Sequence, residues 1–199
     1  MFHDALVPFA ERRIISMANN ESNVIIRPEN PSEYEAVNKL IYTAFAEQHG
    51  IETGKFMMEH FMEERRRDTF IPALSLVAVL EDGTIVGEVA LNETDIATEN
   101  GNITQLVLSQ SAVLPEYRMQ GIMRMLVEYA LDKAEKLGYG AVFLGGNPNL
   151  YARYGFEPSS LYGIYHENRE KWGDEGFMVC ILKAGVLNGV TGTTSYYGG

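Results

Sequence analysis

The chain has 199 residues, 46% of them hydrophobic and 22% charged, which is enough for one globular domain with a substantial core. Its formal net charge of -11 makes a nucleic acid or an anionic membrane an unfavourable partner, whereas a cationic small molecule is tolerated or attracted. The single cysteine, Cys180, excludes an intramolecular disulfide framework and indicates a reducing compartment, and its apolar surroundings are typical of a buried thiol.

Residues 1–22 lack a basic start followed by an apolar block, so we expect an N-terminal extension without a signal peptide. No apolar run reaches the roughly 18 residues that span a bilayer, which predicts a cytoplasmic protein without a membrane segment. Residues 23–199 predict one domain, in which residues 184–199 form a last strand or a tail.

The first elements of the domain are a strand and two helices. A strand is predicted over residues 24–27, followed by a helix for which Ser32 and Glu35 form a capping box. A second helix is predicted over about residues 53–67. One of its faces consists of Phe56, Met57, His60, Phe61 and Glu64.

The middle of the chain predicts three antiparallel strands between Leu74 and Leu114, the first two joined by a turn at residues 81–84. A long helix then begins at Gly121 and ends at Gly138. Its apolar stripe consists of Ile122, Met125, Leu126, Tyr129, Ala130, Ala134 and Leu137. A short strand (YGAVFLGG), a short helix (NPNLYARYGF) and another strand (GFMVCILKAG) follow. The order predicts an α/β fold with a mixed sheet, and residues 104–145 form a right-handed parallel crossover.

A single glycine stands where the long helix begins, in the segment VLPEYRMQGIM. Helices favour Ser, Thr, Asn or Asp there, so Gly121 indicates that something approaches the backbone closely. The unpaired N–H groups and macrodipole of a helix start attract anions, and Arg118 and Arg124 can add positive charge. We interpret the turn as a phosphate site; the alternative is that Gly121 only lets the helix pack closely. The segment contains neither a Walker A loop nor the three-glycine dinucleotide fingerprint.

Two segments together carry a resemblance to a known family. VLPEYRMQGIM resembles the acyl-coenzyme A (acyl-CoA) binding motif of the GNAT-superfamily N-acetyltransferases, Gln/Arg-x-x-Gly-x-Gly/Ala, with Arg118, Gly121 and Met123 at its fixed positions. Met123 departs from the small residue of the motif. GGNPNLYARYGFEP is similar to the Asn-containing strand end and Tyr-x-x-x-Gly-Phe turn of the same enzymes. The resemblance covers about residues 24–183 and looks most like a subgroup of predicted bacterial acetyltransferases of uncertain substrate.

The resemblance implies a GNAT-like acyl-CoA N-acyltransferase fold, with a mostly antiparallel sheet that is splayed at one parallel strand pair and helices on both faces. It also implies that acetyl-CoA is a co-substrate, with its pantetheine arm lying in the splay like an added strand. An N–H near Val113 is implied to polarise the thioester carbonyl. The other residues implied to bind acetyl-CoA are Ala112, Leu114, Arg118, Met119, Gln120, Gly121, Ile122, Met123, Arg124, Asn147 and Tyr151.

Acetyl transfer from a thioester to an amine needs a proton donor for the leaving thiolate and a proton acceptor for the amine. By resemblance Tyr151 is the donor, and the alternative is that its ring only packs at the sheet edge. Glu88 is the favoured base, because it is expected in mid-strand near the splay. Glu93, Asp95 and His166 are further candidates, and for each of the four the pattern favours a solvated surface group over the base. The histidines show no metal-ligand spacing, so we expect no metal.

The resemblance predicts an enzyme that acetylates a primary amine of a small molecule or a peptide by direct attack in a ternary complex. The alternative is a catalytically inactive acyl-CoA-binding regulatory module. The acidic chain favours a cationic acceptor, without choosing among a polyamine, an aminoglycoside-like amine and a protein amine. The resemblance also admits a homodimer.

Overall fold

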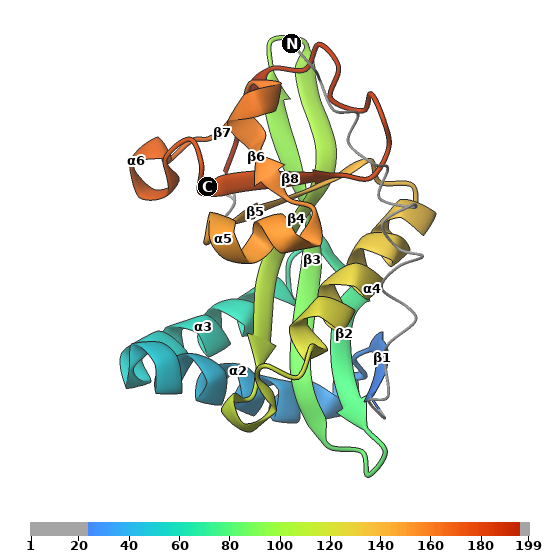
Figure 1. Ribbon diagram of the computed structural model, residues 1–199, viewed down its shortest axis with the longest axis vertical. Coiled ribbons are helices and arrows are strands. Elements are labelled where there is room, and N and C mark those ends of the chain that lie inside the picture. The colour runs from blue at the N-terminus through green and yellow to red at the C-terminus, as the bar shows by residue number, and fades with distance from the viewer. Residues whose placement is uncertain (1–23, 196–199) are drawn as a thin grey trace.

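The computed structural model describes residues 24–195, so the predicted N-terminal extension and the last four residues lie outside the described part of the chain. Within residues 24–195, nine strands form one sheet in which the main order is β1-β2-β3-β4-β5-β8-β6 (Figure 1). None of the described helices is both long and apolar enough to cross a membrane.

The chain enters the sheet through β1 (Val24–Pro28) and continues into the single turn η2 (Pro31–Glu33) and the helices α2 (Tyr34–His49) and α3 (Ile51–Glu64). The predicted capping box is wrong in register. The residues that form it are Asn30 and Glu33, whose side chain accepts from the Asn30 backbone at 2.8 Å. Proline directly after Asn30 fixes the first helical position, so the cap lies two residues before the predicted one.

Three long antiparallel strands follow, and the prediction for this region is confirmed. They are β2 (Phe70–Leu80), β3 (Ile85–Thr98) and β4 (Gly101–Val113), with the predicted turn between the first two. Opposite β3, the register of β4 passes from Leu108 to Gln110, which leaves Ser109 as an extra residue in a β-bulge. The bulge lies in the middle of the molecule, where β4 has lost its other neighbour.

That other neighbour is β5 (Ala141–Gly145), which follows helix α4 (Ile122–Lys136) in the predicted parallel crossover. Only two residue pairs join the strands, at Leu106 and Val107 of β4. β4 then runs on to Val113 without a strand on that side, so the sheet is splayed at this parallel pair as the resemblance implied.

The last third of the chain extends the sheet beyond β5. Its elements are α5 (Pro148–Tyr151), η4 (Ala152–Tyr154), β6 (Glu157–Pro158), η5 (Ser159–Tyr162), β7 (Ile164–His166), α6 (Arg169–Trp172), β8 (Phe177–Ile181) and β9 (Gly192–Thr194). Within the described part of the predicted tail, β9 pairs with both β3 and β7. The pair β7–β9 is parallel, a second such pair that the sequence analysis missed, because both strands are only three residues long.

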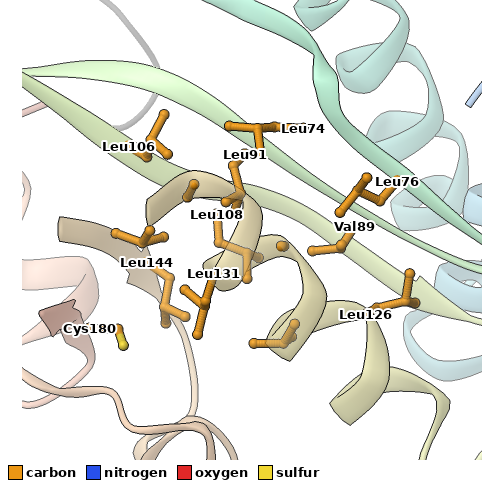
Figure 2. Close-up of a cluster of buried hydrophobic side chains, with 14 of the residues drawn as sticks. Leu74, Leu76, Val89, Leu91, Leu106, Leu108, Leu126, Leu131, Leu144 and Cys180 are labelled. Carbon is orange, nitrogen blue, oxygen red and sulfur yellow. The ribbon is translucent and has the colours of Figure 1, made fainter. Parts of the chain in front are cut away.

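Alternation along β2 shows how helices cover both faces of the sheet. Leu76 belongs to the cluster that contains Leu126 of α4, whereas the next residue, Val77, packs with Ile41 of α2. Figure 2 shows the α4 cluster, in which Leu74, Leu76, Val89, Leu91, Leu106, Leu108, Leu126, Leu131, Leu144 and Cys180 gather between sheet and helix. Cys180 is buried, as predicted. The predicted apolar stripe of α4 is wrong at two positions, because Tyr129 and Leu137 are 39% and 50% exposed.

Candidate active site

A mainly apolar cleft of about 760 Å³ lies where β4 leads into α4. We call it the turn cleft. Its walls come from α2, the end of β4, the turn before α4, and α5 with η4. Nine of the predicted site residues line it: Ala112, Val113, Arg118, Met119, Gly121, Ile122, Met123, Arg124 and Tyr151. The structure therefore brings together residues from two motifs that lie about 30 positions apart in the sequence.

The turn itself is built from two residues in the left-handed region, Met119 at φ 61° and Gly121 at φ 82°. Gly121 is the N-cap of α4, and no side chain caps the helix there. The N–H groups of the first turn of α4 therefore have no intrahelical partner and face the cleft with the positive end of the helix dipole. Met119 adopts a strained conformation that costs about 1–3 kcal/mol, and such strain collects at functional sites. The arrangement suits a bound anion.

Arg118 ties this turn to α2 and to the end of β4. Its Nη1 donates to Glu47 at 2.6 Å, Nη2 to the carbonyl of Ala44 at 2.9 Å, and Nε to the carbonyl of Val113 at 3.2 Å. The guanidinium thus positions the turn as well as adding charge to it. Arg124, one turn into α4, lies 3.6 Å from Glu128 and also faces the cleft.

Tyr151 enters the cleft from α5, and its hydroxyl oxygen lies 3.2 Å from that of Ser111 on β4. Its ring packs against Phe156 and Tyr154. A Cβ on Gly146 would lie 2.6 Å from the ring, so only glycine leaves room for it at that position. Burial raises the pKa of Tyr151, while the hydrogen bond with Ser111 lowers it. The hydroxyl consequently carries its proton at neutral pH, as a proton donor must.

Three predicted cofactor residues do not line the turn cleft. The Leu114 N–H donates to the carbonyl of Val86 at 3.0 Å, so it is already bonded to β3. Gln120 is exposed and its amide donates to the Glu116 carbonyl at 3.1 Å. Asn147 caps α5 by accepting from the Asn149 N–H at 3.0 Å. A capping role for Asn147 explains the Asn-Pro pair that begins this helix.

Glu88 on β3 is only 1% exposed, so its interpretation as a solvated surface group is wrong. Neither carboxylate oxygen has a hydrogen-bond partner among the described residues, and Glu88 lines neither cleft. Burial raises its pKa well above the usual range, Glu29 raises it further, and Arg65 opposes the shift. Burial without a hydrogen-bond partner in the described part of the chain thus favours the neutral form of this carboxyl group.

A second cleft, of about 670 Å³ and mostly polar, lies on the α3 side of β3 and β4. We call it the polar cleft. Its lining residues are Glu64, Arg67, Thr69, Asn92, Glu93, Thr94, Asp95, Thr104, Val107, Ser109 and Ser195. The sequence analysis placed Glu64 on a helix face but missed its role in a cleft. A carboxylate four residues after a histidine, on an otherwise apolar stripe, was the available signal.

Glu64 is 4% exposed and is held by three neighbours. Its Oε2 accepts from the Asn92 amide at 3.1 Å and from the Ser109 hydroxyl at 2.9 Å, and its Oε1 lies 3.1 Å from Nε2 of His60. The bulge at Ser109 turns this hydroxyl toward α3. The two hydrogen bonds therefore fix the orientation of the Glu64 carboxyl group.

The other candidate bases have partners too. Glu93 accepts from the Tyr139 hydroxyl at 2.5 Å, and Asp95 accepts from Asn102 and Thr104. Both line the polar cleft, but only Asp95 is an exposed group. His166 is 6% exposed, so its interpretation as a surface group is also wrong, and its Nδ1 accepts from the Asn168 N–H at 2.9 Å.

Both clefts are lined in part by residues of β4. Ser111, Ala112 and Val113 line the turn cleft, and Val107 and Ser109 line the polar cleft. Ser109 and Ser111 are two positions apart, or about 7 Å along a strand. The linings of the two clefts therefore come within two positions of each other on β4.

Comparison with known proteins agrees with this geometry. Residues 25–159 match the family model described as an acetyltransferase (GNAT) domain. The chain is 31% identical over 176 residues to the uncharacterized N-acetyltransferase YhbS of Escherichia coli K12, covering 87% of this chain and 96% of YhbS. It is 33% identical over 108 residues to YjhQ from the same strain, covering 51% and 59% of the two chains.

Solved structures show the same fold. The crystal structure of YhbS from Escherichia coli in complex with CoA superposes with a TM-score of 0.74 at 28% identity, covering 90% of this chain and 92% of that one. A GNAT acetyltransferase from Brucella melitensis in complex with acetyl-CoA superposes with a TM-score of 0.68 at 21% identity, covering 87% and 95%.

Proposed function

This chain belongs to the GNAT family of N-acetyltransferases, and from that premise we propose that it transfers the acetyl group of acetyl-CoA to a primary amine by direct attack in a ternary complex. The observation that carries the proposal is the uncapped start of α4 at Gly121, which opens into a cleft along the free edge of β4. The complexes of YhbS with CoA and of the Brucella protein with acetyl-CoA support the same ligand here.

The pyrophosphate of acetyl-CoA would bind at the turn, where the N–H groups of residues 119–123 meet the dipole of α4. Gly121 combines a left-handed conformation with the absence of a Cβ, so the phosphate can approach its backbone. Met123 lines this cleft in place of a small residue. The pantetheine would then run along β4 beside Ala112 and Val113, in the position of the missing strand.

Val113 is the strongest candidate for polarising the thioester carbonyl. Because the next N–H, that of Leu114, is directed toward β3, alternation along the strand directs the N–H of Val113 toward the splay. The carbonyl of Val113 accepts from Arg118, which helps to hold this residue in place. A fixed N–H donor at a developing oxyanion stabilises the transition state by about 3–4 kcal/mol.

Tyr151 would donate its proton to the departing thiolate of CoA. A thiol with a pKa near ~8.5 is a tolerable leaving group, so the donor only has to assist. Its protonated hydroxyl and its place at the junction of α5 and β4 support this role. The role of Glu88 as the base stays a prediction, supported by its raised pKa and by its pairing with Ala112 of β4; measuring turnover of Glu88→Gln tests it.

The experiment that tests the function is calorimetric titration with acetyl-CoA, combined with a thiol-release assay against primary amines. Binding together with amine-dependent release of CoA would support the enzyme. Binding without turnover of any amine would favour the alternative, a regulatory module that only holds acyl-CoA. Absence of binding would overturn both.

The net charge of -11 and the single buried cysteine support a cytoplasmic protein with a small-molecule or peptide amine as partner and without nucleic acid. A homodimer, admitted by the family resemblance, is tested by measuring the mass of the full chain in solution.

A further inference from the structure

The polar cleft has an acidic lining that the transfer of an acetyl group does not by itself require. Three carboxylates, Glu64, Glu93 and Asp95, face one guanidinium, Arg67. Most of the remaining lining residues carry hydroxyl or amide groups. The surplus of negative charge favours a positively charged ligand, and the hydroxyl and amide groups supply hydrogen bonds for further polar atoms.

One residue of this lining, Asn92, has a hydrogen-bond acceptor that no other described residue uses. Asn92 is 5% exposed, and its amide nitrogen donates to Glu64 and to Ser109. Its Oδ1 is buried and has no hydrogen-bond partner among the described residues. A buried carbonyl without a partner is destabilising, so a ligand N–H donor that pairs with it stabilises the complex. An ammonium or amine nitrogen is such a donor.

From these observations we propose that the polar cleft binds the acceptor as a primary amine with at least one further positive charge, and that Glu64 takes the proton from the reacting nitrogen. The inference rests on the proposed acetyltransferase activity and names the acceptor class and the base for it. Asn92 and Ser109 donate to one carboxylate oxygen of Glu64, and Nε2 of His60 lies 3.1 Å from the other. Glu64 thus lines the acceptor cleft, whereas Glu88 does not.

The chemical step balances with these groups. An alkylammonium ion loses one proton to the Glu64 carboxylate, and the free amine attacks the thioester carbon to form the new C–N bond. As the C–S bond breaks, the electron pair goes to sulfur, and the thiolate receives the Tyr151 proton. The nitrogen gives up its second proton, which restores Tyr151 through solvent. One proton is released overall, and the products are an N-alkylacetamide and CoA.

The acceptor class is tested with three amines of equal chain length: 1,4-diaminobutane, butylamine and 4-aminobutanoate. The distal group is an ammonium, a methyl and a carboxylate in turn, while the reacting amine stays the same. We expect kcat/KM to fall in that order, by on the order of tenfold or more from first to last. Asp95→Asn removes one negative charge from the wall of the polar cleft, so it should raise KM for diaminobutane with little change in kcat. The ratio of kcat/KM for diaminobutane to kcat/KM for 4-aminobutanoate should therefore become smaller.

The base is tested with Glu64→Gln, for which kcat should fall on the order of 10²-fold or more. Its calorimetric titration with acetyl-CoA should match wild type, which shows that the turn cleft is intact. Glu63→Gln is the matched control, since Glu63 is the preceding residue, is exposed and lines neither cleft. We expect its kinetics to equal those of wild type.

The outcomes separate the inference from the proposed function. Wild-type protein that neither binds acetyl-CoA nor releases CoA overturns the function itself. Wild-type protein that binds acetyl-CoA but acetylates none of the three amines, or favours 4-aminobutanoate, overturns the acceptor class. Full turnover in Glu64→Gln, or a loss seen in Glu88→Gln alone, overturns the assignment of the base. Should Glu64→Gln fail to fold, Asp95→Asn tests the polar cleft in its place: an unchanged ratio of kcat/KM between diaminobutane and 4-aminobutanoate overturns the proposal.

Discussion

The hydroxyl oxygens of Tyr151 and Ser111 lie 3.2 Å apart, which joins the short helix α5 to the free edge of β4. This contact sets the phenol beside the part of β4 that lines the turn cleft. In the proposed reaction the proton donor for the CoA thiolate lies at this edge, and the contact fixes the Tyr151 hydroxyl there.

Replacing Tyr151 by Phe removes the donor and keeps the ring. We expect kcat to fall on the order of 10²-fold, while the affinity for acetyl-CoA measured by calorimetry stays within about twofold. Tyr129→Phe serves as the control, because Tyr129 lies on the outer side of α4 and is 39% exposed. Wild-type turnover in Tyr151→Phe would show that the phenol only packs.

A carboxylate at position 121 should abolish acetyl-CoA binding. Gly121 lies at φ 82°, and a Cβ there would meet no atom within 4 Å, so the space is open but the backbone is strained for any other residue. Comparing Gly121→Glu with Gly121→Gln separates charge from strain, since both side chains have the same length. We expect weak binding in the Gln variant and none in the Glu variant; equal affinities would argue against a phosphate at this turn.

A buried ion pair anchors the end of α3 beside the polar cleft. Arg65 donates to both carboxylate oxygens of Glu29, at 3.0 and 2.8 Å, and the two side chains are 5% and 2% exposed. Glu29→Gln leaves the guanidinium without its counter-charge, which should lower the free energy of unfolding by about 3–5 kcal/mol. Urea denaturation measures the change. The exposed pair of Glu63 and Arg66 is the comparison, and Glu63→Gln should cost less than about 1 kcal/mol.

The lowered pKa of Glu33 predicts a loss of stability in acid. Its hydrogen bonds with Arg27, followed by those with Asn30, lower its pKa from 4.5 to about 2. Because the pKa of Glu33 is lower in the folded protein than in the unfolded chain, ionised Glu33 stabilises the fold. This stabilisation is complete above pH 4.5, the pKa in the unfolded chain, and is lost as the pH falls toward about 2. The difference in unfolding free energy between wild type and Glu33→Gln should therefore shrink over this range. A constant difference would show that Glu33 is not the group responsible.

Local patterns predicted the elements on which the site is built. Periodicity located α4, the three long strands and the parallel crossover, because each is long enough to repeat its pattern several times. Arg118, Gly121 and Tyr151 were predicted from two motifs, and all three line one cleft. The family resemblance supplied the pairing of those motifs, which spacing alone does not give.

The parts that sequence reasoning missed depend on contacts between distant segments. Glu64 and Ser109 are 45 positions apart, and their hydrogen bond follows from a one-residue bulge that no local pattern indicates. Glu88 looked like an outward position on a strand, but both faces of this sheet are covered by helices, so it is buried. Strands of two or three residues, such as β6 and β7, carry too few side chains to show alternation.

Only two residue pairs join β4 and β5, so little backbone pairing connects the two parts of the main strand order there. Strands β1 to β4 form one block and β5, β8 and β6 another, while α4 packs against the first and contacts the second through its apolar cluster. A ligand that lies in the splay would fasten the two blocks together and bind only when both are folded. Acetyl-CoA at a hundred times its Kd should then stabilise the chain by about 2.7 kcal/mol and make the unfolding of the blocks more concerted.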